Sequence, residues 1–231
     1  MVSVENSSFV LLFSLLNGIY HGIGADHMLA VSTLARKGAR RADVARLGLR
    51  FGMAHAGVLL VLCTVAVIWN FSVSPAWESR AEIFGGALLI LLGAWTFLEW
   101  LREAGHIHSH QHTHAPDAPP HTHYHFHLQE DHPKKHTHPH TSTLLGALFA
   151  FSGLRALLIT AVPIMQSRSL WLILLYLGVF GLGIILSMTV WGLIFGSALK
   201  GERSGHWVSL TLSLSSVALG MYWIGTAGGP V

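Results

Sequence analysis

Three side chains within seven residues of the first apolar segment are suited to holding a metal ion. His21 and His27 offer imidazole nitrogens, and Asp26 offers a carboxylate. Imidazole and carboxylate together form a donor set for divalent ions such as Ni²⁺, Co²⁺, Cu²⁺ and Zn²⁺. Ionisable groups are expensive to place in hydrocarbon, so such a cluster in an apolar segment indicates a functional site. We predict a metal site here; helix packing through hydrogen-bonded polar side chains is the alternative.

The spacing of these residues requires a break in the helix that carries them. At about 100° per residue, an unbroken helix separates His21 from Asp26 by about 140° and from His27 by about 120°. Three side chains spread so widely cannot meet at one ion. Gly22 and Gly24 lie between them, and glycine tolerates a local break. We expect a distorted helix that turns the three groups inward, with both imidazoles as ligands and Asp26 either ligating or orienting a ring.

The composition is that of an integral membrane protein. Mean hydropathy is +0.51, and charged residues make up 11% of the chain, against about 25% in soluble domains. The single cysteine, Cys63, excludes an intrachain disulfide and a thiolate zinc site. Six segments are long enough to cross about 30 Å of hydrocarbon: residues 8–34, 48–70, 82–101, 144–166, 170–198 and 207–227. We therefore predict an all-α, polytopic membrane protein with six transmembrane helices.

The basic residues predict the orientation of these spans. Eleven of the 14 lysine and arginine residues fall in the three connections on one side. The positive-inside rule places these connections in the cytoplasm and both termini outside, in the inner (plasma) membrane of the cell. Three spans on each side of the central loop then enter from opposite faces, which gives an inverted 3+3 topology like that of many secondary transporters. The positive charge thus reflects topology, and we expect no nucleic-acid partner.

The central loop gives a second indication of metal handling. Thirteen histidines lie between His106 and His140, mostly at alternate positions, and five prolines interrupt them. Too little apolar material remains for a core, so we expect this loop to be disordered without metal. Such a tract is a weak, multi-site metal binder that could concentrate, buffer or sense ions; a solvated linker is the alternative. The chain divides into a first half (1–105), this loop (106–143) and a second half (144–231).

A fourth candidate ligand lies in the second span. His55 is a polar residue among apolar ones, at a depth that the first span can reach. An interhelical hydrogen bond is the competing interpretation, and nearby Met53 is packing material. Arg155, inside the fourth span, needs a carboxylate or carbonyl partner, and Asp26 is one candidate. The predicted metal ligands are therefore His21, Asp26, His27 and His55.

These residues carry a family resemblance. The stretch His21-x4-Asp26-His27, followed by Arg36-Lys37, resembles the HX4DH signature of the nickel/cobalt transporter family (NiCoT) and its relatives in the NicO group. The stretch Gly52-Met-Ala-His55 is similar to the histidine motif of that family's following helix. The chain departs from eight-span members in its six helices and in lacking carboxylates within its later spans. Its closer comparison is a short branch with urease-associated and efflux-type members and His-rich loops.

The resemblance implies a transporter of divalent transition metal ions, Ni²⁺ or Co²⁺ in preference to Zn²⁺, with no permanent cofactor. Its expected partners are the ion and the lipid bilayer, with a metallochaperone or urease and hydrogenase maturation proteins as further candidates. We expect uptake; efflux of the same ions and a metal-storing chaperone or sensor are the alternatives. Metalloprotease, hydrolase-elbow and P-loop motifs do not occur in the sequence, so we expect no enzyme activity.

Overall fold

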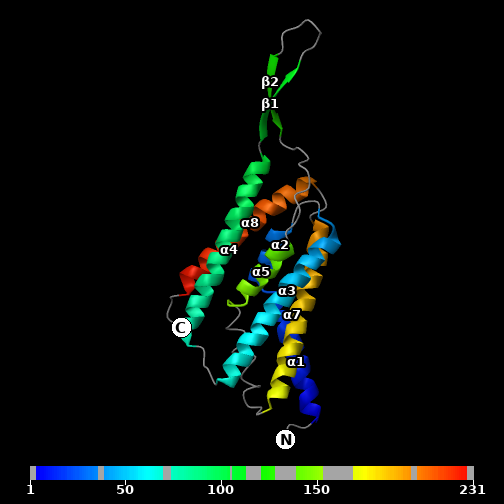
Figure 1. Cartoon of the computed structure of the whole chain (residues 1–231), viewed down its shortest axis with the longest axis vertical. Helices are drawn as coiled ribbons and strands as arrows, with labels where there is room; N and C mark the ends of the chain where they lie inside the picture. The colour runs from blue at the N-terminus through cyan, green and yellow to red at the C-terminus, as the bar shows by residue number, and fades with distance from the viewer. Residues whose placement is uncertain are drawn as a thin grey trace.

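Long apolar helices run side by side along the molecule, and a two-stranded hairpin extends from one end of them (Figure 1). The computed structural model describes residues 4–35, 39–69, 74–104, 106–112, 121–127, 139–152, 169–198 and 202–227. Its elements are α1 (Val4–Gly22), α2 (Ala25–Leu34), α3 (Arg41–Ile68), α4 (Pro75–Ala104), β1 (His106–His112), β2 (His121–His127), α5 (Pro139–Phe149), α7 (Leu170–Ala198) and α8 (Glu202–Thr226).

Four helices are long and apolar enough to cross a membrane, namely Arg41–Ile68, Pro75–Arg102, Leu170–Ser197 and Gly205–Thr226. Ser8–Gly22 and Ala25–Leu34 pass the same test together, as one span bent by 54°. The described residues therefore hold four candidate spans, or five with the bent pair. Most of the span expected at 144–166 lies outside the described residues, where α5 is followed by residues 153–168. The six-span count and the inverted 3+3 topology stay predictions.

The helices alternate in direction along the long axis (Figure 1). The start of α3 and the ends of α4 and α7 lie at the end that carries the hairpin, and the N-terminus of the chain lies at the other. Arg40 and Arg46 flank Asp43 at the start of α3, with ion-pair distances of 2.9 and 3.0 Å. These pairs are exposed and contribute little to stability, but they mark the hairpin end as the basic end.

Glycines allow the helices to approach closely, as in other membrane bundles. A Cβ atom on Gly86 of α4 would lie 2.7 Å from the carbonyl oxygen of Gly220 of α8, and one on Gly220 would overlap the carbonyl oxygen of Gly86. The contact is reciprocal. Between α1 and α7, a Cβ atom on Gly18 would overlap the carbonyl oxygen of Phe180, and one on Gly183 would lie 2.5 Å from the carbonyl oxygen of Leu15. The pairs α4/α8 and α1/α7 are thus held by backbone proximity that a side chain would prevent.

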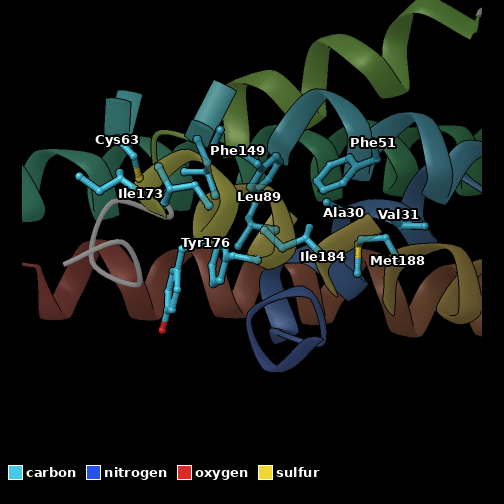
Figure 2. Packing of buried hydrophobic residues seen from close by; sticks show 14 residues of the cluster. Ala30, Val31, Phe51, Cys63, Leu89, Phe149, Ile173, Tyr176, Ile184 and Met188 are labelled. Atoms are coloured by element: carbon cyan, nitrogen blue, oxygen red, sulfur yellow. The ribbon is translucent and has the colours of Figure 1, made fainter. Parts of the chain in front are cut away.

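The apolar core gathers around α7 (Figure 2). Phe51, Leu89, Phe149, Ile184 and Met188 come from four different helices and are all fully buried. The outer faces of the bundle are apolar as well, with large exposed hydrophobic side chains along the described helices. A water-soluble bundle rarely exposes so much contiguous apolar surface, whereas lipid covers it without cost.

The hairpin occupies part of the segment in which we expected disorder. β1 and β2 pair antiparallel, with His106 opposite His127 and His112 opposite His121. The composition of this tract predicts disorder, but its histidines alternate with residues such as Ile107, Tyr124 and Phe126. A two-residue period with β-branched and aromatic residues favours strands. α5 also begins at Pro139, before the expected end of the loop at residue 143.

Candidate metal centre

The break that the spacing predicts in the first span is present. α1 ends at Gly22 and α2 begins at Ala25, with the two axes bent by 54°. The amide of Gly24 donates to the carbonyl oxygen of His21 at 3.0 Å, while the amide of Met28 donates to the carbonyl oxygen of Gly24 at 3.0 Å. Gly24 therefore closes one helix and opens the next, so few backbone groups are left unsatisfied at the break.

Both positions at the break need glycine, because neighbouring atoms approach their Cα atoms too closely for a side chain. A Cβ atom on Gly24 would lie 2.7 Å from Oδ1 of Asp26 and 3.3 Å from Nδ1 of His27. A Cβ atom on Gly22 would overlap the hydroxyl oxygen of Ser187 on α7. The break can thus bring the Asp26 carboxylate back over its own turn only because residue 24 has no side chain.

Three imidazoles meet at this break. His21 lies in the last turn of α1, His27 lies in the first turn of α2, and His55 lies in the middle of α3. Nε2 of His55 lies 3.1 Å from Nε2 of His21 and 3.1 Å from Nε2 of His27. His27 and His55 are fully buried, and His21 is partly buried. One ligand atom from each lies within 4.8 Å of the others, so the three can share one ion.

These nitrogen separations fit a bound ion. Two nitrogens bound at about 2.1 Å lie about 3.0 Å apart when they meet at a right angle and about 3.4 Å apart in a tetrahedron. Both separations in the structure, 3.1 Å, fall between these two values. Without an ion, Nε2 of His55 would have to serve two neighbouring imidazoles with one proton or one lone pair. The donor set is therefore better matched to a cation than to hydrogen bonding alone.

Asp26 lies behind His27 and outside the group of three imidazoles. Its Oδ2 atom is 2.8 Å from Nδ1 of His27, the ring nitrogen on the side away from His55. This distance is short enough for an ion pair, but the N–H group of His27 does not point at the carboxylate well enough for an aligned hydrogen bond. Asp26 is buried, with 7% of its surface exposed. Of the two roles open to it in the sequence, this position suits orienting the ring.

Aromatic rings enclose the imidazoles. Phe51 stacks on His55 with ring centroids 6.0 Å apart and planes 11° apart, and it meets the ring of His27 edge-on at 6.1 Å. Phe180 of α7 lies 5.7 Å from His21. The backbone of Gly146 on α5 lies beside the imidazole of His55, although Nδ1 of that ring has no aligned partner among the described residues. Aromatic rings therefore lie against all three imidazoles of the site.

Sequence reasoning identified the four polar residues but not these aromatic rings. Phe51 precedes His55 by one helical turn and so shares its face, which is a usable signal. Phe180 has no such signal, because the residues around it on α7 are also apolar. Met53 is 54% exposed and does not line the site. Arg155, considered as a partner for Asp26, lies outside the described residues.

Comparisons with known proteins indicate the family of the chain. A family model described as NicO, high-affinity nickel-transport protein, matches residues 8–228, which include all three histidines. The chain is also similar to a urease accessory protein, UreH, of Bacillus sp. (strain TB-90). The two are 25% identical over 223 residues, which cover 94% of this chain and 89% of that protein. No solved structure matches the chain.

Proposed function

The chain belongs to the NicO family of high-affinity nickel-transport proteins, and on that premise we propose that it imports Ni²⁺ through the site formed by His21, His27 and His55. The family membership makes it a multi-pass membrane transporter of a divalent metal ion and not an enzyme. The residues that hold the ion, the direction of transport and the side of the membrane on which each end lies are the parts that we propose.

One observation carries the proposal: three imidazoles, two of them buried and one partly buried, converge at a broken span. Polar side chains buried in a membrane bundle are rare and mark ion pathways. Transporters commonly bind substrate where a helix is interrupted, since the break supplies both side chains and free backbone groups. The Nε2 separations of 3.1 Å match one ion between the rings.

The family membership supports Ni²⁺ in preference to Zn²⁺ as the transported ion. Imidazole nitrogens are suitable donors for Ni²⁺. Three imidazoles leave further positions for water, which allows the ion to enter and leave. Co²⁺ is the second expected substrate, because imidazole binds it as well, with lower affinity in the general order of divalent ions.

Asp26 supports the ion without touching it. A carboxylate on the far ring nitrogen fixes the orientation of a metal-binding histidine and raises the basicity of the other nitrogen. The negative charge also offsets part of the charge of the buried ion. In this proposal His21, His27 and His55 are ligands and Asp26 positions His27.

We propose uptake toward the cytoplasm, with the hairpin end of the bundle on the cytoplasmic side. The basic residues at that end support the orientation through the positive-inside rule. The relative named as a urease accessory protein supports delivery of nickel to metallochaperones or to urease and hydrogenase maturation proteins. Both the partners and the placement in the inner membrane belong to the proposal.

Nickel accumulation in cells that lack other nickel permeases tests the proposal. Expression of the intact chain is expected to raise accumulation, and His21→Ala, His27→Ala and His55→Ala are each expected to abolish the increase, because each removes one of three ligands. His206→Ala is the matched control: this histidine also lies in a spanning helix but packs on Trp100, 4.9 Å between ring centroids. Lower accumulation with the intact chain would reverse the direction to efflux. Full activity in the His55 variant would refute the site.

A further inference from the structure

The proposed transport site is less buried on one side than on the others. His27 is 2% exposed and His55 is 0% exposed, whereas His21, in the last turn of α1, is only partly buried. An ion that enters beside His21 therefore displaces less packed protein than one that enters beside either of the other two rings. The entry route is accordingly expected on the His21 side of the site.

One face of α1 is closed to an ion by α7. A Cβ atom on Gly18 would overlap the carbonyl oxygen of Phe180, so the two backbones leave no room between them. Nearer the N-terminus of the chain, the hydroxyl of Ser14 is fully buried and donates to the carbonyl oxygen of Tyr176 at 2.8 Å. The contact between the two helices is thus continuous over this length, and an ion must reach His21 along a different face of α1.

Asn17 lies on such a face, one helical turn before His21. At about 100° per residue, residues 17 and 21 lie about 40° apart around α1, whereas residues 17 and 18 lie about 100° apart. Residues four apart on a helix have Cβ atoms about 5 to 6 Å apart. Asn17 is half-buried, and α1 runs from the end of the bundle that holds the N-terminus toward the bend (Figure 1). Asn17 therefore lies on the path from that end to His21.

The amide group of Asn17 is fixed through its nitrogen and leaves its oxygen available. Nδ2 donates to the carbonyl oxygen of Phe13 at 2.9 Å, while Oδ1 accepts no hydrogen bond from the part of the chain that the structure describes. A polar side chain in an apolar membrane helix is costly and indicates a functional contact. Carbonyl oxygens can replace water molecules around a cation. The oxygen of Asn17 is therefore suited to receiving a hydrated divalent cation.

We propose that Asn17 is the entry residue of the transport site, where its amide oxygen replaces one water molecule of the incoming ion before the ion passes to His21. This role depends on the proposed function. Imidazole suits Ni²⁺ better than a carbonyl oxygen does, so the ion moves on to the rings and does not remain at Asn17. Because the same barrier is crossed on release, Asn17 accelerates both directions and leaves the equilibrium affinity unchanged.

Asn17→Leu tests this role, because leucine has a similar size but no oxygen. The probe is NiCl₂, mixed rapidly with the full-length protein in detergent, and release is followed after the loaded protein is mixed with a chelator. Both rate constants are expected to fall about tenfold, the effect of losing one contact of hydrogen-bond strength with a charged group. The dissociation constant from equilibrium dialysis is expected to stay the same.

Two further variants control this experiment. Thr211→Val is the matched control and should keep the parent rates, since its hydroxyl also donates to the carbonyl oxygen four residues earlier, at 2.9 Å, but on α8. Asn17→Asp retains an oxygen at the same place and is expected to restore fast binding.

Parent rates in Asn17→Leu would overturn the proposal. A loss of equilibrium affinity in Asn17→Leu as large as that in His55→Ala would also overturn it, because Asn17 would then hold the bound ion. Retained nickel binding in a His55→Ala chain would refute the transport site, whereas unchanged rates in Asn17→Leu would refute only the role of Asn17. The two failures are therefore distinguishable.

Discussion

At the scale of single residues, the site is organised around one atom. Nε2 of His55 lies 3.1 Å from Nε2 of His21 and 3.1 Å from Nε2 of His27. The imidazole ring of His55 also stacks on the ring of Phe51. A nitrogen with one lone pair or one proton cannot satisfy both neighbours equally, whereas an ion between the three rings satisfies all of them. The packing that fixes His55 therefore also fixes where an ion would sit.

Asp26→Asn tests whether the carboxylate acts through His27. The change keeps the size of the side chain but removes its charge, and loss of such a supporting group typically lowers metal affinity about 10- to 100-fold. We expect the nickel concentration for half-maximal uptake to rise by this factor. X-ray absorption at the nickel edge is expected to count the same imidazoles in the variant and the parent; a changed coordination shell would make Asp26 a direct ligand.

At the scale of elements, the bent span is the feature that the sequence predicted best. Angular spacing around a regular helix excluded convergence of His21 and His27, and glycine at positions 22 and 24 gave the place of the break. His55 was found because a polar residue stands out in an apolar helix. The contact of Phe180 with His21 was not predicted, because the sequence does not distinguish one apolar residue of α7 from another before the helices are packed.

The hairpin, by contrast, was not predicted from the sequence. Composition predicts a disordered loop, but the alternation of histidine with Ile107, Tyr124 and Phe126 also fits a strand. Pairing of two such segments depends on contacts between residues that are distant in sequence, and a strand propensity read from one segment does not reveal its partner.

Gly24→Ala tests whether the break must be free of side chains. The added methyl group would lie 2.7 Å from Oδ1 of Asp26, so the carboxylate must move away from His27. We expect nickel affinity to fall about tenfold, as for other disturbed supporting groups. Gly57→Ala is the control, because a Cβ atom there meets nothing within 4 Å although His55 is only two residues away. Equal affinities in the two variants would argue against the role of Gly24.

Gly220→Val tests the contact between α4 and α8. The new side chain would overlap the carbonyl oxygen of Gly86, and overpacking of this kind typically costs about 1 to 3 kcal/mol. We expect a lower thermal unfolding midpoint in detergent. Gly225→Val on the same helix has open space at its Cβ and should leave the midpoint nearly unchanged. A similar loss in both variants would attribute the effect to valine in the helix instead of to the contact.

At the scale of the whole molecule, the arginines at the start of α3 and the hairpin lie at the same end of the bundle. The helices alternate in direction, and the start of α3, with its arginines, lies at the hairpin end (Figure 1). This arrangement places the hairpin at the same end as the basic residues, the end that we propose to be cytoplasmic.

Single introduced cysteines test the orientation in a Cys63→Ser background. Ser109→Cys in the hairpin is expected to react with a membrane-impermeant maleimide only after the cells are permeabilised. Ser74→Cys, an exposed residue just before α4 at the opposite end, is expected to react in intact cells. The reverse pattern of labelling would place the hairpin outside and contradict uptake toward that side.

The most direct test of the central claim is the anomalous scattering of nickel from crystals of the protein loaded with NiCl₂. We predict one peak at the bend between α1 and α2, about 2.1 Å from Nε2 of each of His21, His27 and His55. The absence of a nickel peak among these three rings, in crystals that bind nickel elsewhere, would contradict the account.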